Sequence, residues 1–242
     1  MLLGNLTYAE VSEAASNGAI AIVPTGCTEQ QGPHLPVDFD TWFVTMVSIA
    51  AAERAREEHD VNVLVAPTLP FGPTPEHRSF GSGYVDLPQS VHEEVIAAVL
   101  GSLRDQGFRQ LLIWRGCGGH DLGRVVAAFN REAPDCVAHQ PDLPYRDIWL
   151  QHGDPRDEGG HADGFATSLA LHLRPELVRH DRIADPNNDP VDWDDPALDF
   201  GRYSSTGVIG RPTVASSALG ERIWDEAIRR VARILESISH GH

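Results

Sequence analysis

Short apolar segments alternate with longer amphipathic segments along this chain, and no other feature constrains the fold as strongly. Four of the apolar segments have the length and content of buried strands: residues 19–24, 61–67, 110–114 and 136–139. Helical spacing of apolar residues follows them, as in residues 88–106. A repeated strand–helix order predicts an α/β fold with a mainly parallel sheet that helices flank on both faces.

The remaining segments are consistent with one compact unit. Thr7 and Glu10 have the spacing of a capping box at the start of a first helix. The acidic, proline-rich residues 181–203 show no periodicity and are expected to form a surface loop. We find no internal repeat and no low-complexity linker, so we expect residues 1–242 to form a single domain. The other expected helices cover residues 40–58, 122–131, 162–173 and 220–239.

The charge and apolar content of the chain argue against several kinds of partner. The net charge is −16 with only 19 Lys and Arg, which argues against binding to nucleic acid or to an anionic membrane. The apolar runs are far shorter than the ~20 residues of a membrane span, and the first residues lack the pattern of a secretory signal. The three cysteines have irregular spacing, which does not predict a disulfide framework. We therefore expect a cytoplasmic protein.

Two polar loops follow the first and third expected strands. Ligands of open parallel sheets bind at the carboxyl ends of strands, where these loops lie. The first loop contains Glu29, Gln31 and His34 and leads to Asp40. Carboxylates and imidazoles at such spacing can converge on a cation. The alternative is a polar loop in which Asp38 or Asp40 only caps the next helix.

The second loop is Arg115-Gly-Cys117-Gly118-Gly119-His120. Glycines at a strand-to-helix turn allow backbone amides to point at a ligand. Arg115 and His120 are expected to lower the pKa of the Cys117 thiol, which would make it a nucleophile with histidine as its base. The alternative is a tight turn around an inert thiol.

Three segments together resemble the motifs of a known family. The first loop resembles G-S-x-E-Q-H-G-P-H-L-P-x-x-x-D, the second resembles N-G-H-G-G-N, and the segment that begins at His161 resembles H-A-G-E-x-E-T-S. Residues 206–220 resemble a later G-x-x-G-x-P-x-x-A segment. In this order the motifs are similar to those of the creatininase family, which are metal-dependent amidohydrolases. A lone histidine before a helix, such as His161, would otherwise be more often a cap or a surface residue.

The resemblance implies a fold and an activity. Members of this family have a parallel sheet flanked by helices and form a hexamer or a similar homo-oligomer. They hydrolyse a C–N bond in a cyclic or linear amide, and a pair of divalent ions, usually zinc or manganese, activates the water. We therefore expect a homo-oligomeric hydrolase with a small-molecule substrate.

Only some of the family's metal-ligand positions hold the same residue type in this chain. Glu29 stands at the first glutamate ligand and Asp40 at the bridging aspartate, whereas Gln31 and Cys117 stand where the family has histidines. Gly164 and Ala166 replace both glutamates of the third motif. Without these ligands two close cations would lack the negative charge that holds them together, so a two-metal centre is not expected. The ligands that remain favour one zinc ion, in preference to manganese, on Glu29, Asp40 and Cys117.

Three hypotheses follow for the function. The first is an amidohydrolase with one metal ion. The second is a metal-independent enzyme on the same scaffold that uses Cys117 for hydrolysis, cyclisation or elimination. The third is a non-catalytic relative that binds a ligand or stabilises an assembly. The residues proposed as catalytic are Cys117, His120, His161 and Glu29, those proposed to bind substrate are Arg115, His34, Gln31, Gly118 and Gly119, and Trp114, Trp149 and Trp193 are candidates for a pocket wall.

Overall fold

A four-stranded parallel sheet forms the centre of the protein. The computed structural model describes residues 1–154, 159–187 and 190–241. The strand order is β2-β1-β3-β4, and each neighbouring pair is parallel. This arrangement confirms the predicted α/β class. The strands are β1 (Ile20–Thr25), β2 (Val63–Val65), β3 (Gln110–Arg115) and β4 (Val137–His139).

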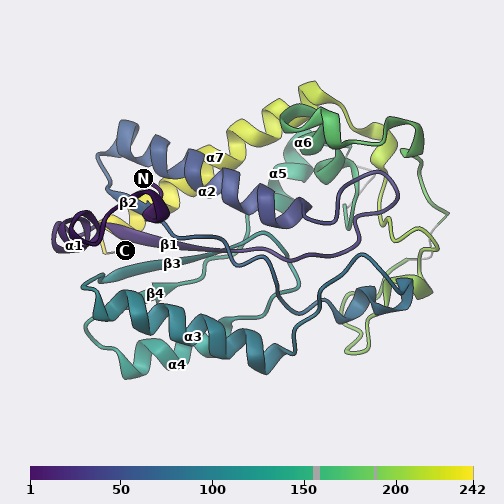
Figure 1. Cartoon of the computed structure of the whole chain (residues 1–242). Helices are drawn as coiled ribbons and strands as arrows, with labels where there is room; N and C mark the ends of the chain where they lie inside the picture. Colours follow the sequence, from purple (N-terminus) through teal and green to yellow (C-terminus); the bar gives the residue numbers. More distant parts are fainter. Residues whose placement is uncertain (155–158, 188–189, 242) are drawn as a thin grey trace.

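Helices pack on both faces of the sheet, as Figure 1 shows for α2 and α7 on one side and α3 and α4 on the other. One face is covered by α1 (Tyr8–Ser16), α3 (Gln89–Asp105) and α4 (Gly123–Glu132). The other face is covered by α2 (Phe39–His59), α5 (Tyr145–His152), α6 (Gly164–Leu173) and α7 (Ser217–Ser239).

No described helix has the length and apolar content needed to cross a membrane.

Side chains of the central strands point alternately to the two faces of the sheet, and this divides the core into two clusters. Ile20 and Ile22 of β1 pack toward α2 and α7, whereas Ala21 and Val23 pack toward α1 and α3. All six residues of β1 are buried. Successive side chains of a strand point to opposite faces, so a strand covered on both faces must be apolar throughout. This requirement explains why the strands appear in the sequence as continuous apolar runs.

The structure corrects several expected elements. The predicted capping box of Thr7 and Glu10 is present. Neither Asp38 nor Asp40 caps α2, because the N-cap residue Asp38 makes no side-chain cap bond and Asp40 points into the molecule. Helix α5 was not expected, and short 3₁₀ helices lie after β2 and in the segment expected to be a surface loop. The first is Pro75–Phe80, in the loop after β2. The other two, His180–Arg182 and Phe200–Arg202, lie at the two ends of the 181–203 segment. Residues 188 and 189 of that segment lie outside the described residues.

One glycine brings the loop after β3 against α2. A Cβ atom on Gly116 would lie 2.4 Å from the backbone oxygen of Asp40 and 3.0 Å from Cβ of Val44. Only glycine permits this approach. The loop that carries Cys117 therefore lies directly beside the first turn of α2, which carries Asp40.

We expect the substitution Leu112→Ala to lower the free energy of unfolding by about 2–5 kcal/mol, because it opens a cavity in the centre of the sheet. Leu112 lies in β3 and is fully buried. The matched control is Val137→Ala in the edge strand β4, where the side chain is 41% exposed and little packing is lost. Chemical denaturation measures both effects; equal losses for the two variants would contradict this description of the core.

Candidate active site

A cavity of about 680 Å³ opens at the carboxyl end of the sheet. Its polar floor includes Glu29, Gln31, Asp40 and Cys117, from the loops after β1 and β3 and the start of α2. Ligand sites of parallel sheets occur at this edge. The apolar wall includes Phe39, Phe43, Tyr145, Trp149, Phe165 and Phe200.

The floor is a compact group of acidic side chains. The Cys27 thiol lies 3.0 Å from Oε2 of Glu29 and 3.4 Å from Oδ2 of Asp40. The Cys117 thiol lies 3.9 Å from Oε2 of Glu29. All four side chains are buried. Such a set of carboxylates and thiols provides oxygen and sulfur ligands for a divalent ion.

Gln31 connects the two carboxylates. Its side-chain amide donates to Oδ2 of Asp40 at 2.7 Å and to Oε1 of Glu29 at 3.2 Å. Gln31 stands where the family motif has a histidine ligand. The N–H groups of the amide thus supply partial positive charge to the carboxylates of Glu29 and Asp40. In a two-metal site, a second cation would neutralise these charges. The structure therefore places Gln31 among the acidic groups of the cavity floor.

His161 directs an unprotonated nitrogen at Glu29. Its Nε2 lies 2.6 Å from the backbone oxygen of Gln30, which can only accept a hydrogen bond, so the ring proton of the neutral imidazole is on Nε2. Burial lowers the pKa of His161 to about 3, so the ring is neutral at physiological pH. The Nδ1 lone pair then faces Oε1 of Glu29 at 3.5 Å. Two acceptors at this distance favour a proton or a cation between them.

His77 is a member of the site that the sequence analysis missed. It is fully buried in the 3₁₀ helix after β2, and its Nε2 lies 3.4 Å from Oε2 of Glu29. Its Nδ1 lies 3.0 Å from the side-chain amide nitrogen of Gln30, whose oxygen accepts the N–H of Gly32. His77 Nδ1 is therefore an acceptor, and Nε2 directs its proton toward Glu29. The only signal in the sequence was its place in the loop after the second strand.

Burial raises the pKa values of the acidic groups. It raises the pKa of Glu29 to about 7, although a hydrogen bond from Cys27 opposes the shift. Burial, with the neighbouring charge of Glu29, raises the pKa of Asp40 well above its usual range. Burial, with the hydrogen bond to Cys117, raises the pKa of Cys27. A cation bound beside these groups would therefore stabilise their charged forms.

The expected low pKa of Cys117 was wrong. The hydrogen bond with Cys27 lowers it, but burial and the nearby carboxylates raise it by more, to about 11. Nη1 of Arg115 donates to the backbone oxygen of His120 at 2.8 Å. The thiol is thus protonated when no cation is bound.

The other expected site residues divide into two groups. Gly118 and Gly119 line the cavity, whereas His34, Arg115 and His120 are not among the described residues that line it. Nε2 of His34 pairs with Oγ1 of Thr167 at 2.8 Å, and this contact ties the first loop to α6. We therefore describe His34 as a buried positioning residue and do not retain it as a contact to substrate.

Among the tryptophans, Trp149 and Trp193 line the cavity. Trp114 is fully buried in the core, and its Nε1 donates to the Tyr145 hydroxyl at 2.9 Å. The hydroxyl of Tyr145 is thereby fixed behind the cavity wall. Of the three candidates for a pocket wall, only Trp114 is purely a core residue.

The raised pKa of Glu29 predicts a pH dependence of stability in the metal-free protein. A carboxyl whose pKa is higher in the folded state than in the unfolded state stabilises the fold at low pH. That contribution is lost between its unfolded pKa of about 4.3 and the folded value of about 7. With chelator present, the difference in unfolding free energy between wild type and Glu29→Gln should fall by about 1 kcal/mol per pH unit from pH ~5 to pH ~7. A difference that is constant with pH would contradict the buried acidic carboxyl.

The fold and the site define an α/β protein with a carboxylate–thiol–imidazole centre at the carboxyl edge of a parallel sheet. The family model described as creatinine amidohydrolase matches residues 4–235. The chain therefore belongs to the creatininase family.

Curated relatives and solved structures agree with this assignment. The chain is 33% identical to a mycofactocin precursor peptide peptidase of Mycobacterium tuberculosis, over 96% of the chain and 92% of the relative. It is 25% identical to a creatinine amidohydrolase of Pseudomonas putida, over 96% and 95%. The crystal structure of a creatinine amidohydrolase from Bacteroides fragilis matches with a TM-score of 0.83 and 25% identity, over 99% of the chain and 96% of that structure. Solved creatininases, similar in fold, include forms designated Mn and Zn-Zn.

Proposed function

We propose that this protein is a hydrolase that cleaves an amide bond of a peptide, with one divalent ion held by Glu29, Asp40 and Cys117. The observation that carries the proposal is the cavity itself, in which an acidic floor lies under an aromatic wall. Its volume of about 680 Å³ is in the middle of the range for ligand sites and exceeds the needs of a small cyclic amide. The peptidase relative supports a peptide as substrate, in place of the small molecule expected from the sequence.

The donor atoms of Cys27, Glu29 and Asp40 lie within 4.8 Å of one another, and Sγ of Cys117 lies 3.9 Å from Oε2 of Glu29, so the cavity floor offers oxygen and sulfur donors for one divalent ion. Carboxylate oxygens and a thiolate are accepted zinc ligands, and three protein ligands leave a position open to water. The lone pair of His161 Nδ1 faces Oε1 of Glu29 and is available to a cation or a proton, whereas the N–H of His77 Nε2 points at Oε2 and stabilises the charge of the carboxylate. A bound ion of this kind polarises a carbonyl oxygen and makes water a stronger nucleophile.

The side chains of the chain itself supply positioning and proton transfer. The hydrogen bond from His161 Nε2 to Gln30 fixes the ring and leaves Nδ1 as an acceptor for a proton at the floor of the cavity. Gln31 keeps the carboxylates of Glu29 and Asp40 together. The aromatic wall excludes water and accepts apolar side chains of a peptide.

The test compares metal removal with thiol alkylation on a set of synthetic peptides, with release of new amino termini as the readout. We expect a chelator to lower the rate by at least about 1,000-fold and zinc to restore it, since the ion supplies several kcal/mol to the transition state. Iodoacetamide should act slowly on the buried, protonated Cys117. Hydrolysis that resists the chelator and is lost rapidly with iodoacetamide would instead support catalysis by the thiol.

A further inference from the structure

Strand register places two cysteines together at the cavity floor. Thr25 of β1 pairs with Arg115 of β3, and Cys27 and Cys117 each lie two residues beyond these partners. Parallel pairing thus carries both thiols to the same edge of the sheet, where the two sulfur atoms lie within 4.8 Å of each other. Both cysteines are buried, and neither forms a disulfide.

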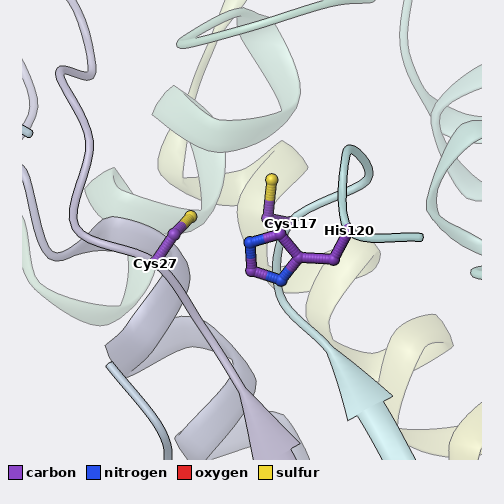
Figure 2. A group of neighbouring side chains, drawn as sticks. All are labelled: Cys27, Cys117 and His120. Carbon is purple, nitrogen blue, oxygen red and sulfur yellow. The ribbon is translucent and has the colours of Figure 1, made fainter. Parts of the chain in front are cut away.

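A buried histidine without hydrogen-bond partners lies beside the two thiols. His120 is fully buried, and neither ring nitrogen has a partner among the described residues. An unpaired polar group in the interior costs about 1–3 kcal/mol, so a structure that retains one calls for an explanation. One nitrogen of His120 and the two sulfur atoms all lie within 4.8 Å of one another. Figure 2 shows the ring of His120 next to the two cysteines.

The position of His120 is fixed from several sides. Arg115 donates to its backbone oxygen at 2.8 Å, and the His92 ring packs against its ring with 4.9 Å between centroids. A Cβ atom on Gly72 would lie 2.3 Å from Nε2 of His120, so the absence of a side chain at this position makes room for the ring. The imidazole is therefore held in place before any ligand binds.

We propose that Cys27, Cys117 and His120 form a thiolate–imidazole site for a zinc-class divalent ion, with Glu29 as the nearest oxygen donor. The Zn–S and Zn–N bond lengths of about 2.3 and 2.0 Å in a tetrahedron place ligand atoms roughly 3.5–3.8 Å apart. The donors here lie within 4.8 Å of one another, so small side-chain rotations complete the site. Oε2 of Glu29 is 3.0 Å from the Cys27 sulfur and 3.9 Å from the Cys117 sulfur.

The replacements along the family motifs support this assignment. The motifs have serine at the position of Cys27 and asparagine at the position of His120, neither of which is among the ligand positions carried over above. The histidine ligand of the second motif is here Cys117. This chain has therefore lost two imidazole ligands, at Gln31 and Cys117, while it has gained two thiols and an imidazole within reach of one another. Such a donor set prefers zinc over manganese, because thiolates favour softer ions. The inference deepens the proposed function, since it reassigns the ligands of the same ion.

The experiment follows cobalt(II) bound to the intact, metal-free protein. Cobalt replaces zinc in tetrahedral sites, and each thiolate ligand adds a sulfur-to-metal charge-transfer band. We expect the band in wild type to fall by about half in Cys27→Ser and also in Cys117→Ser. In His120→Asn the band should remain, with the dissociation constant for cobalt raised by at least about 100-fold. The matched control is Cys136→Ser, a buried thiol that packs with α3 and α4 and should leave the band unchanged.

X-ray absorption of zinc-loaded wild type counts the sulfur ligands directly and needs no variant to fold. Two sulfurs per zinc ion support the proposal. One sulfur, with a cobalt band that Cys27→Ser leaves unchanged, overturns it and leaves the Glu29–Asp40–Cys117 site and the proposed function intact. No bound cobalt or zinc at all overturns both this proposal and the metal-dependent function.

Discussion

Glu29→Gln should abolish hydrolysis while it leaves the protein folded and at least as stable as wild type at pH 8. Glu29 is 3% exposed and contacts both thiols, Gln31 and two histidines, so its carboxylate is the common neighbour of every group at the cavity floor. Its replacement removes an anionic ligand of the ion, and we expect kcat/KM to fall by at least about 1,000-fold, or about 4 kcal/mol. Steady-state kinetics and thermal denaturation of the same preparation measure the two effects.

Glu76→Gln provides the matched control. Glu76 also lines the cavity, and its Oε1 lies 3.7 Å from Nε2 of His77, but it is more exposed than Glu29 and touches neither thiol. We expect kcat/KM to change by less than about 10-fold. A loss in Glu76→Gln as large as that in Glu29→Gln would show that general negative charge, and not the contacts of Glu29, sustains the activity.

Trp149→Ala should cause the largest loss of stability among single changes at the cavity wall. The indole is 2% exposed and packs tightly against the backbone of Gly153 and Gly164, where a Cβ atom would lie 2.6 and 2.5 Å from the ring. The two glycines have no side chain that could fill the space that the substitution leaves. We expect the unfolding free energy to fall by about 3–5 kcal/mol, which corresponds to a decrease in Tm of roughly 6–20 °C.

Trp193→Ala is the comparison for this change. Trp193 lines the same cavity but is 52% exposed and packs edge-to-face on Phe200, with 5.8 Å between the ring centroids. Its loss should lower Tm by less than about 3 °C and raise KM for peptides with apolar side chains. Equal decreases of Tm in the two variants would contradict the difference in packing described here.

The sequence predicted the fold well because the pattern behind it is local. Strands buried on both faces must be apolar throughout, so β1 and β3 are visible as uninterrupted runs, and the capping box of Thr7 and Glu10 marks the start of α1. Helix α5 escaped prediction because only Ile148 and Trp149 of its eight residues are buried. A segment of eight residues is too short to establish a helical period.

The site was predictable only where a motif carried it. Glu29 and Asp40, which the first motif singled out, lie at the cavity floor, and the register between β1 and β3 brings Cys117 to the same edge of the sheet. His77 was missed because its place beside Glu29 depends on a 3₁₀ helix after β2, which no local pattern announced. The pKa of Cys117 was misjudged because the thiol is buried beside the carboxylates of Glu29 and Asp40, a tertiary detail that sequence spacing does not contain.

The most direct test of the account is the metal content of protein purified without a histidine tag, measured by plasma mass spectrometry beside the Cys117→Ser variant. Cys117 belongs to the ligand set of the proposed hydrolase and to the thiolate–imidazole site. We predict about one zinc ion per chain in wild type, lost from the variant together with peptide hydrolysis. Wild-type protein that holds no metal after exposure to zinc and still hydrolyses peptides would contradict the account.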